Sequence, residues 1–164
     1  TVAMVLLNIV PIREFYDGVD WAVVVLLGAM IPLGAALETT GTTTLLVNGI
    51  LAVAGDMSPV FLIAMILIIT MSVSDVLNNA ATAILMAPIA FNIALSLNLN
   101  PDAFLMAVAV GASCAFLTPI GHQNNALIMG PGGYKFGDYW RMGLPLEIVI
   151  VVVALPLLLI VWPL

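Results

Sequence analysis

The sequence predicts an all-α integral membrane protein in which a re-entrant helical hairpin and a discontinuous helix bring polar groups to one site. Of the 164 residues, 63% are hydrophobic and only 7% are charged, whereas soluble domains carry roughly 25% charged residues. Two Asn-Asn-Ala triplets, at residues 78–80 and 124–126, interrupt long apolar runs. Neutral amides supply donors and acceptors at membrane depth at a far lower cost than an unpaired carboxylate.

Composition also limits the partners of the chain. The basic residues Arg13, Lys135 and Arg141 give no electrostatic surface for nucleic acid, and the lone Cys114 has no internal disulfide partner. Thr1 opens an apolar run without a basic signal-peptide region. A spanning helix needs about 20 apolar residues, so 164 residues hold only a handful of membrane elements. We therefore expect a fragment that lies in the lipid bilayer and lacks the N-terminal half of the same protein.

Residues 1–58 are expected to form partial scaffold helices and an interfacial connector. Pro11–Asp20 has the charged residues of an aqueous loop, and Asp20 is suited to cap the helix that follows. Trp21–Leu37 is apolar and predicts a span that kinks or packs closely around Pro32. Leu45–Ala54 is too short to cross a membrane and is expected to lie along its surface.

Residues 59–100 predict a re-entrant hairpin. The apolar stretch Val60–Leu97 is interrupted at Ser72–Asn79, which leaves two arms near the lower limit for a full crossing. Non-helical backbone at that depth is tolerated only where protein buries it or a water-filled cavity faces it. The hairpin tip is thus a candidate site.

Residues 101–164 predict a broken helix, a cytoplasmic loop and a last span. A helix over Ala103–Leu117 is expected to unwind at Thr118–Asn125, where Pro119 and Gly121 lie, and to resume through Met129. A solvent loop then leads to a spanning helix over Met142–Trp162, which Pro145 and Pro156 bend without stopping.

Sidedness follows from the basic residues. The loop with Arg13 and the loop with Lys135 and Arg141 fall on one side of the membrane, whether the hairpin re-enters or both its arms cross. The positive-inside rule makes that side cytoplasmic. A re-entrant hairpin then enters from outside.

Several polar residues admit more than one interpretation. The amide pairs either line an ion site or hydrogen-bond helix to helix, and their position at two breaks favours the ion site. His122 either contacts an anion, takes up a proton or tethers unwound backbone. Asp75 either balances a cation or caps the second hairpin arm. Glu38 and Glu147 are interpreted as interfacial or pairing residues.

Three segments resemble the C-terminal half of the divalent anion:sodium symporters, the carriers of sulfate, citrate and C4 dicarboxylates. They are residues 21–41, the hairpin segment 74–88 with Asn78-Asn79-Ala80, and the break 113–126 with Gly121-His122-Gln123. The Gly-His-Gln variant is most similar to the bacterial anion-permease branch. The resemblance implies one half of an inverted-repeat carrier, in which each half gives a re-entrant hairpin and a broken helix to a central site, and implies a homodimer.

The resemblance also implies roles for individual residues. Sodium, the coupling ion and the only cofactor-like partner expected, would bind Ser74, Asn79 and the Gly121 carbonyl. The expected contacts of the small anionic substrate are Asn78, Asn79, Ala80, His122 and Gln123. Secondary candidates are Asp75, Thr118, Asn124 and Asn125. Asn78 and Ala80 depart from the Ser-Asn-Thr typical of such tips, which makes sulfate at least as plausible as a di- or tricarboxylate.

The expected function is therefore sodium-coupled symport of a small divalent anion by alternating access. An ion antiporter or oxyanion efflux permease of the same superfamily is the first alternative. An intramembrane enzyme using His122, Asp75 and Ser74 is a further alternative, although the sequence offers no nucleophile–base arrangement or metal cluster. A purely structural membrane subunit is the last.

Overall fold

The computed structural model describes residues 21–54 and 57–164, and all regular elements in these two ranges are helical. The predicted loop at Pro11–Asp20, with Arg13, lies outside the described residues. In chain order the elements are α3 (Trp21–Thr39), α4 (Thr42–Ala54), α5 (Pro59–Ser74), α6 (Asn79–Ser96), α7 (Pro101–Ala112), α8 (Gln123–Met129), the 3-10 helix η1 (Phe136–Asp138) and α9 (Tyr139–Val161). The all-helical prediction is confirmed for the part of the chain that the structure describes.

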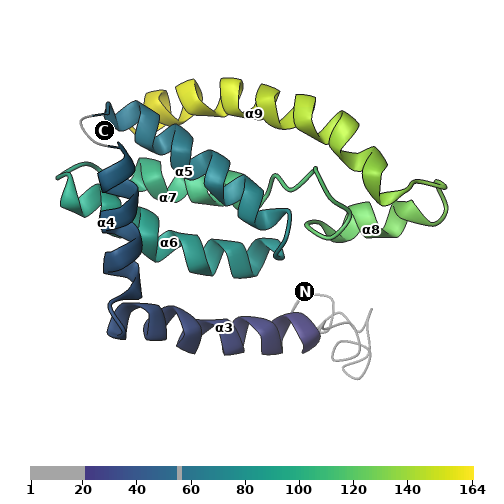
Figure 1. The fold of residues 1–164 in the computed structure, drawn as a ribbon, viewed down its shortest axis with the longest axis horizontal. Coiled ribbons are helices and arrows are strands. Elements are labelled where there is room, and N and C mark those ends of the chain that lie inside the picture. The colour runs from purple at the N-terminus through teal and green to yellow at the C-terminus, as the bar shows by residue number, and fades with distance from the viewer. Residues whose placement is uncertain (1–20, 55–56) are drawn as a thin grey trace, which may run out of the picture.

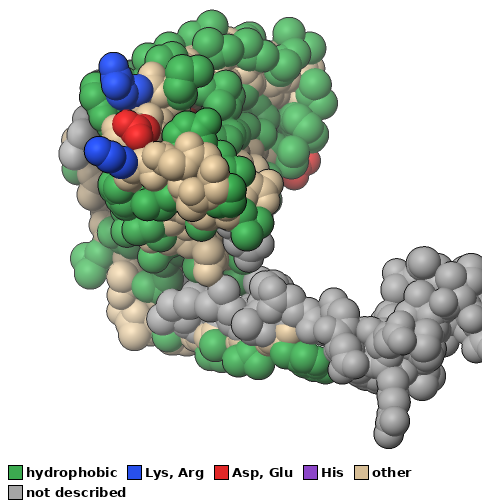
Figure 2. Space-filling view, turned by 90° about the vertical axis from the view of Figure 1, so that its right-hand side faces the viewer, with side chains coloured by type: hydrophobic (Ala, Val, Ile, Leu, Met, Phe, Trp, Pro, Cys, Tyr) green, Lys and Arg blue, Asp and Glu red, His purple; other side chains and the backbone are tan. Residues whose placement is uncertain are grey.

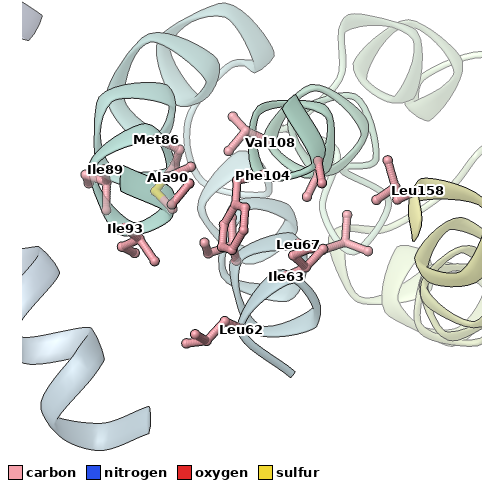
Figure 3. Packing of buried hydrophobic residues seen from close by; sticks show 14 of the residues in the cluster. Leu62, Ile63, Leu67, Met86, Ile89, Ala90, Ile93, Phe104, Val108 and Leu158 are labelled. Carbon is pink, nitrogen blue, oxygen red and sulfur yellow. The ribbon is translucent and has the colours of Figure 1, made fainter. Parts of the chain in front are cut away.

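Helices α5, α6 and α7 form the packed centre of the structure (Figure 1). Phe104 of α7 lies among Ile63 and Leu67 of α5 and Ala90 of α6, and all four side chains are fully buried (Figure 3). A Cβ built at Gly111 of α7 would lie 2.9 Å from the Leu67 carbonyl oxygen. The two helices therefore approach closely through a small residue, as helices in membranes commonly do.

Helix α9 covers this centre on one side. Leu158 packs into the core cluster, while Val149, Val152 and Val153 are exposed. Pro145 and Pro156 both lie inside α9, which continues through them as expected. The outward face of α9 is apolar and suited to contact lipid or further protein.

Two helical segments among the described residues are long and apolar enough to cross a membrane, namely α6 and the continuous run Phe136–Val161. Helix α5 has 16 residues and α7 has 12. At about 1.5 Å per residue they span roughly 24 Å and 18 Å, which is less than the hydrocarbon core of about 30 Å. The re-entrant geometry of the hairpin stays a prediction.

Several predicted boundaries were wrong. Helix α7 ends at Ala112, before the expected Leu117, and α8 begins at Gln123, inside the stretch predicted to be unwound. Helix α9 begins at Tyr139, inside the expected loop, and the 3-10 helix η1 directly precedes it. The segment expected to be a connector is the helix α4, which begins at Thr42 and runs across the other helices in Figure 1; its position along the membrane surface stays a prediction.

The end of the molecule that carries the α8–α9 turn gathers the described basic residues. Figure 2 shows the Lys and Arg side chains, which are Lys135 and Arg141 in the described ranges, with an acidic side chain between them on a surface that is otherwise hydrophobic or uncharged. The exposed aromatic residues Tyr134 and Trp140 lie in the same segment. Aromatic and basic residues together are typical of a membrane–water interface.

Candidate functional site

The hairpin tip is built from a helix end and a helix start. Helix α5 ends at Ser74, and α6 starts at Asn79 after a short turn whose last residue, Asn78, is extended. The Asn78 side-chain oxygen accepts a 2.8 Å hydrogen bond from the Ala81 N–H, so Asn78 is the N-cap of α6. The interpretation of Asp75 as the cap of the second arm was therefore wrong.

The break between α7 and α8 is held open by carboxylates from other elements. The Leu117 N–H donates to Asp75 Oδ1 at 2.9 Å, and the Phe116 N–H donates to Glu147 Oε1 at 3.4 Å. A helix continuing past Ala112 would need both N–H groups for its own backbone bonds. Their capture explains why α7 stops before the predicted Leu117.

Four oxygen- or amide-bearing groups converge where the hairpin tip meets this break. They form what we call the oxygen cluster, which consists of Ser74 Oγ, the Asn79 side-chain amide, and the carbonyl oxygens of Ala112 and Gly121. The Asn79 amide atom that faces the cluster lies 2.9 Å from the Gly121 oxygen, 3.1 Å from the Ala112 oxygen and 3.2 Å from Ser74 Oγ. Ser74 Oγ itself donates to the Ala112 carbonyl at 2.7 Å.

The orientation of the Asn79 amide depends on what the cluster holds. The two ends of an amide have nearly the same shape, so the partners decide which end faces them. With nitrogen inward, Asn79 donates to the surrounding acceptors. With oxygen inward, the carbonyl oxygens of Asn79, Ala112 and Gly121 face one another and the Ser74 hydroxyl is the one donor in the cluster, an arrangement that suits a bound cation. Neutral oxygens of this kind fit sodium.

The oxygen cluster depends on a very close approach of two backbone segments. A Cβ built at Gly121 would lie 2.6 Å from the Ser74 carbonyl oxygen and 3.1 Å from the Asp75 Cα. Real Cβ atoms essentially never come within 3.0 Å of another heavy atom. Only glycine at position 121 lets the break lie this close to the end of α5.

Two secondary candidates hold the backbone of the break. Thr118 Oγ1 donates to the Asp75 carbonyl oxygen and accepts from the Ile120 and Gly121 N–H groups. Asn125 Nδ2 donates to the carbonyl oxygens of Ala115 at 3.1 Å and Thr118 at 3.2 Å. The side chains of Thr118 and Asn125 thus position the break.

His122 begins the second half of the broken helix. It is the N-cap of α8, and its Nδ1 accepts from the Asn124 N–H at 3.3 Å. The interpretation of His122 as a backbone tether therefore agrees with the contact of its Nδ1 atom. Asn124 is exposed and Ala80 is half-buried, while the side chain of Gln123 lies outside the described part of the structure.

The acidic residues lie deeper than expected. Glu147, interpreted as interfacial or pairing, is only 8% exposed, and Asp75 is 4% exposed. Glu147 lies two turns inside α9 and accepts the Phe116 N–H, which agrees with the pairing interpretation. Within the described ranges, no group of three or more His, Cys, Asp or Glu residues is placed to bind a metal ion.

A cavity of about 830 Å³ opens on the other side of the break, toward the α8–α9 turn. Phe116, Asn125, Tyr139 and Arg141 are among its lining residues, and Asn79 is not. Tyr139 contributes a further contact, because its hydroxyl donates to the Asn125 carbonyl oxygen at 2.7 Å. The cavity is thus separate from the oxygen cluster, although both adjoin the break.

Sequence reasoning grouped Ser74, Asn79 and Gly121, and the structure brings these three residues together. It missed the Ala112 carbonyl, which no side-chain pattern reveals, and the contacts of Glu147 and Tyr139 with the break. The buried position of Glu147 had one available signal, namely an acidic residue inside a long apolar run.

Comparison with known proteins adds the family. A profile described as citrate transporter matches residues 1–164. The chain belongs to the citrate transporter family. It is 42% identical to the uncharacterized transporter sll0640 of Synechocystis over 95% of this chain and 25% of that protein. The expected kinship with anion carriers is therefore confirmed.

Two further relatives of this citrate transporter family member have more specific names. One is sodium/sulfate cotransporter 2 of Chlamydomonas reinhardtii, 30% identical over 82% of this chain and 15% of that protein. The other is the sodium-dependent dicarboxylate transporter SdcS of Staphylococcus saprophyticus, 25% identical over 85% of this chain and 27% of that protein. The chain thus spans about a quarter or less of the length of these relatives, which are named transporters and not enzymes.

Proposed function

We propose that this chain belongs to the C-terminal half of a secondary active carrier that couples sodium to the symport of a small divalent anion, either sulfate or a di- or tricarboxylate. The oxygen cluster carries the proposal, because the Asn79 amide lies within 3.2 Å of the Gly121, Ala112 and Ser74 oxygens at a helix break, and turning its own oxygen inward would give a cation a set of neutral oxygen ligands. The relatives named sodium/sulfate and sodium-dependent dicarboxylate transporters support both the ion and the substrate class.

Sodium in the oxygen cluster would join the hairpin tip to the break. Ser74 and Asn79 belong to the tip, while Ala112 and Gly121 flank the break, so one ion bridges both elements. The anion then binds beside the ion at the first turn of α6, where the N–H groups of Asn79 and Ala80 precede the first intrahelical bonds. Sodium and anion raise each other's affinity by the same factor.

The proposed anion contacts divide between the two elements. Asn78 uses its oxygen as the cap, which leaves its Nδ2 group to donate to an anion. His122 and Gln123 start α8 on the opposite side of the break. These residues, with Asn79 and Ala80, offer the anion contacts without a fixed positive charge. The bound sodium ion supplies the positive charge that an anion site usually takes from a basic side chain.

The proposal includes an arrangement in the membrane. Residues 59–100 form the hairpin that re-enters from outside, residues 101–164 hold the broken helix and last span, and 1–58 belong to the scaffold. The turn with Lys135 and Arg141 is cytoplasmic. An N-terminal half supplies the symmetry-related hairpin and break, and two copies form a homodimer. Thiol-reactive probes that label Lys135→Cys from outside intact cells would contradict this orientation.

The test uses the full-length carrier in proteoliposomes. A sodium gradient at constant pH is expected to drive uptake of labelled sulfate, succinate or citrate, whereas an antiporter or efflux permease is expected to respond to a proton gradient instead. Asn79→Ala removes one cluster oxygen, worth about 1.5–3 kcal/mol for a bond to a charged partner. Sodium affinity should fall roughly 10- to 100-fold.

Asn48→Ala is the matched control, because Asn48 is an exposed amide on α4. The control should keep the sodium dependence of the parent protein. Uptake by Asn79→Ala with unchanged sodium affinity would remove Asn79 from the site and overturn the proposal.

A further inference from the structure

The cavity of about 830 Å³ beside the break has no part in the proposed sodium and anion sites. It lies between α8 and the start of α9, at the end of the molecule that carries their turn (Figure 1). Its volume is within the range of about 300–1,000 Å³ that is usual for small-molecule sites. Most of its wall is apolar, and Phe116, Ile128 and Leu146 belong to it. A small doubly charged anion would lose its water there without gaining enough polar partners, so the cavity does not suit the transported substrate.

The wall of the cavity changes from polar to apolar along α9. Tyr139 and Arg141 line it at the start of the helix, and Met142 and Leu146 line it further along. From Tyr139 to Leu146 the helix rises roughly 10 Å, at about 1.5 Å per residue. Because α9 belongs to the run Phe136–Val161, which is long and apolar enough to cross a membrane, this direction leads from the membrane surface toward its hydrocarbon core. A ligand that fits the cavity therefore has a polar end at the surface and an apolar end below it.

The polar end of the cavity favours an anionic group. Arg141 lines it, and no hydrogen-bond or ion-pair partner of the Arg141 side chain is found among the described residues. The acidic lining residue is Asp138, whose Oδ2 already accepts the Lys135 N–H at 2.8 Å. The turn thus holds two basic side chains, Lys135 and Arg141, and one acidic side chain, so positive charge is in excess. The planar guanidinium of arginine matches the geometry of a phosphate group.

The membrane itself supplies a ligand with this arrangement of groups. The exposed aromatic residues Tyr134 and Trp140 place the turn at the level of the lipid headgroups. A glycerophospholipid has its phosphate at that level and its acyl chains below. Anionic lipids are abundant in the cytoplasmic leaflet, which is the side proposed for this turn, and basic pockets between membrane helices bind their headgroups.

We propose that this cavity binds an anionic glycerophospholipid, with its phosphate on the Arg141 guanidinium and an acyl chain against Phe116, Ile128 and Leu146. The bound lipid packs between α8 and α9 and contacts the break through Phe116. The site goes beyond the proposed function, because it needs neither sodium nor the transported anion. Only the choice of leaflet rests on the proposed orientation.

Native mass spectrometry of the delipidated full-length carrier, without sodium salts or substrate, tests the site. Phosphatidylglycerol is expected to bind more tightly than phosphatidylcholine with the same acyl chains. Arg141→Gln loses a charge-assisted contact with the phosphate and should weaken the binding of phosphatidylglycerol at least about tenfold. Arg141→Lys keeps the charge and should keep the preference for the anionic lipid.

Two controls separate the cavity from general attraction to the turn. Lys135→Gln removes the same charge from the same turn, but Lys135 does not line the cavity, so binding should weaken by less than about fivefold. Glycerol 3-phosphate offers a phosphate without acyl chains and should not compete with the lipid. A phosphatidylglycerol with a photoactivatable acyl chain should attach close to Ile128 or Leu146.

Several results would overturn the proposal. They are equal affinity for the two lipids, equal losses in Arg141→Gln and Lys135→Gln, and competition by glycerol 3-phosphate, which would indicate a site for a soluble anion. A wild type that binds no lipid at this place would also overturn it, because another part of the full-length protein would then fill the cavity. Sodium-dependent uptake is measured separately, so either proposal can fail without the other.

Discussion

Replacing Gly121 by alanine is the most direct way to perturb the meeting of hairpin tip and break. The added Cβ would lie 2.6 Å from the Ser74 carbonyl oxygen, and ordinary contact begins at 3.4 Å. The two segments must therefore separate by about 0.8 Å. Overpacking of this kind costs about 1–3 kcal/mol of stability.

The separation also moves the Gly121 carbonyl out of the oxygen cluster. Loss of one hydrogen-bond-strength interaction with a charged partner is worth about 1.5–3 kcal/mol. At 1.4 kcal/mol per tenfold change, sodium affinity of the full-length carrier should fall by roughly 10- to 100-fold. The maximal uptake rate at saturating sodium should change less, because the anion contacts at the start of α6 are unaltered.

The assay is sodium-dependent uptake into proteoliposomes, with the melting temperature of the same preparation measured in parallel. Gly49→Ala is the control, because a Cβ at this exposed position on α4 meets nothing within 4 Å. It should keep wild-type sodium affinity and gain up to about 1 kcal/mol of helix stability. Wild-type sodium affinity and melting temperature in Gly121→Ala would refute the reasoning.

Three other substitutions test single contacts, each by thermal unfolding and uptake of the full-length carrier. Asn78→Ala removes the cap of α6 and should cost about 1 kcal/mol, whereas Asn78→Ser should restore most of it; equal losses would contradict the capping role. Tyr139→Phe deletes the 2.7 Å bond to the Asn125 carbonyl and should cost about 1 kcal/mol, with no change in sodium affinity. Thr82 has a buried Oγ1 without a partner among the described residues, so Thr82→Val should be neutral or stabilising by about 1 kcal/mol; lost uptake would show that the hydroxyl serves a ligand.

The sequence was sufficient to locate the elements that meet at the site. Polar residues interrupt apolar runs at Ser72–Asn79 and at Thr118–Asn125, and the structure has a connection between helices in both regions. An apolar run must either continue as a helix or satisfy its backbone in some other way at this depth. Two polar interruptions therefore indicated two breaks.

The errors in the prediction arise from contacts between distant residues. Leu117 is apolar and looks helical, yet its N–H bonds Asp75, which lies 42 positions earlier. Phe116 similarly bonds Glu147, 31 positions later. Local propensity contains no information on such partners, and a backbone carbonyl such as that of Ala112 leaves no mark on the sequence at all. The functional roles of the cluster residues stay predictions.

The two hydrogen bonds from the break to Asp75 and Glu147 also determine which parts of the chain move as one unit. Asp75 fastens the break to the end of α5, and Glu147 fastens it to α9. A rearrangement that separated hairpin, break and α9 would strand N–H groups where little water can replace the lost partners. Alternating access in the proposed carrier therefore requires these three elements to shift as a single rigid body. Flexing is then expected outside these three elements, where the turn at Gly41, with a φ of +73°, joins α3 to the crossing helix α4.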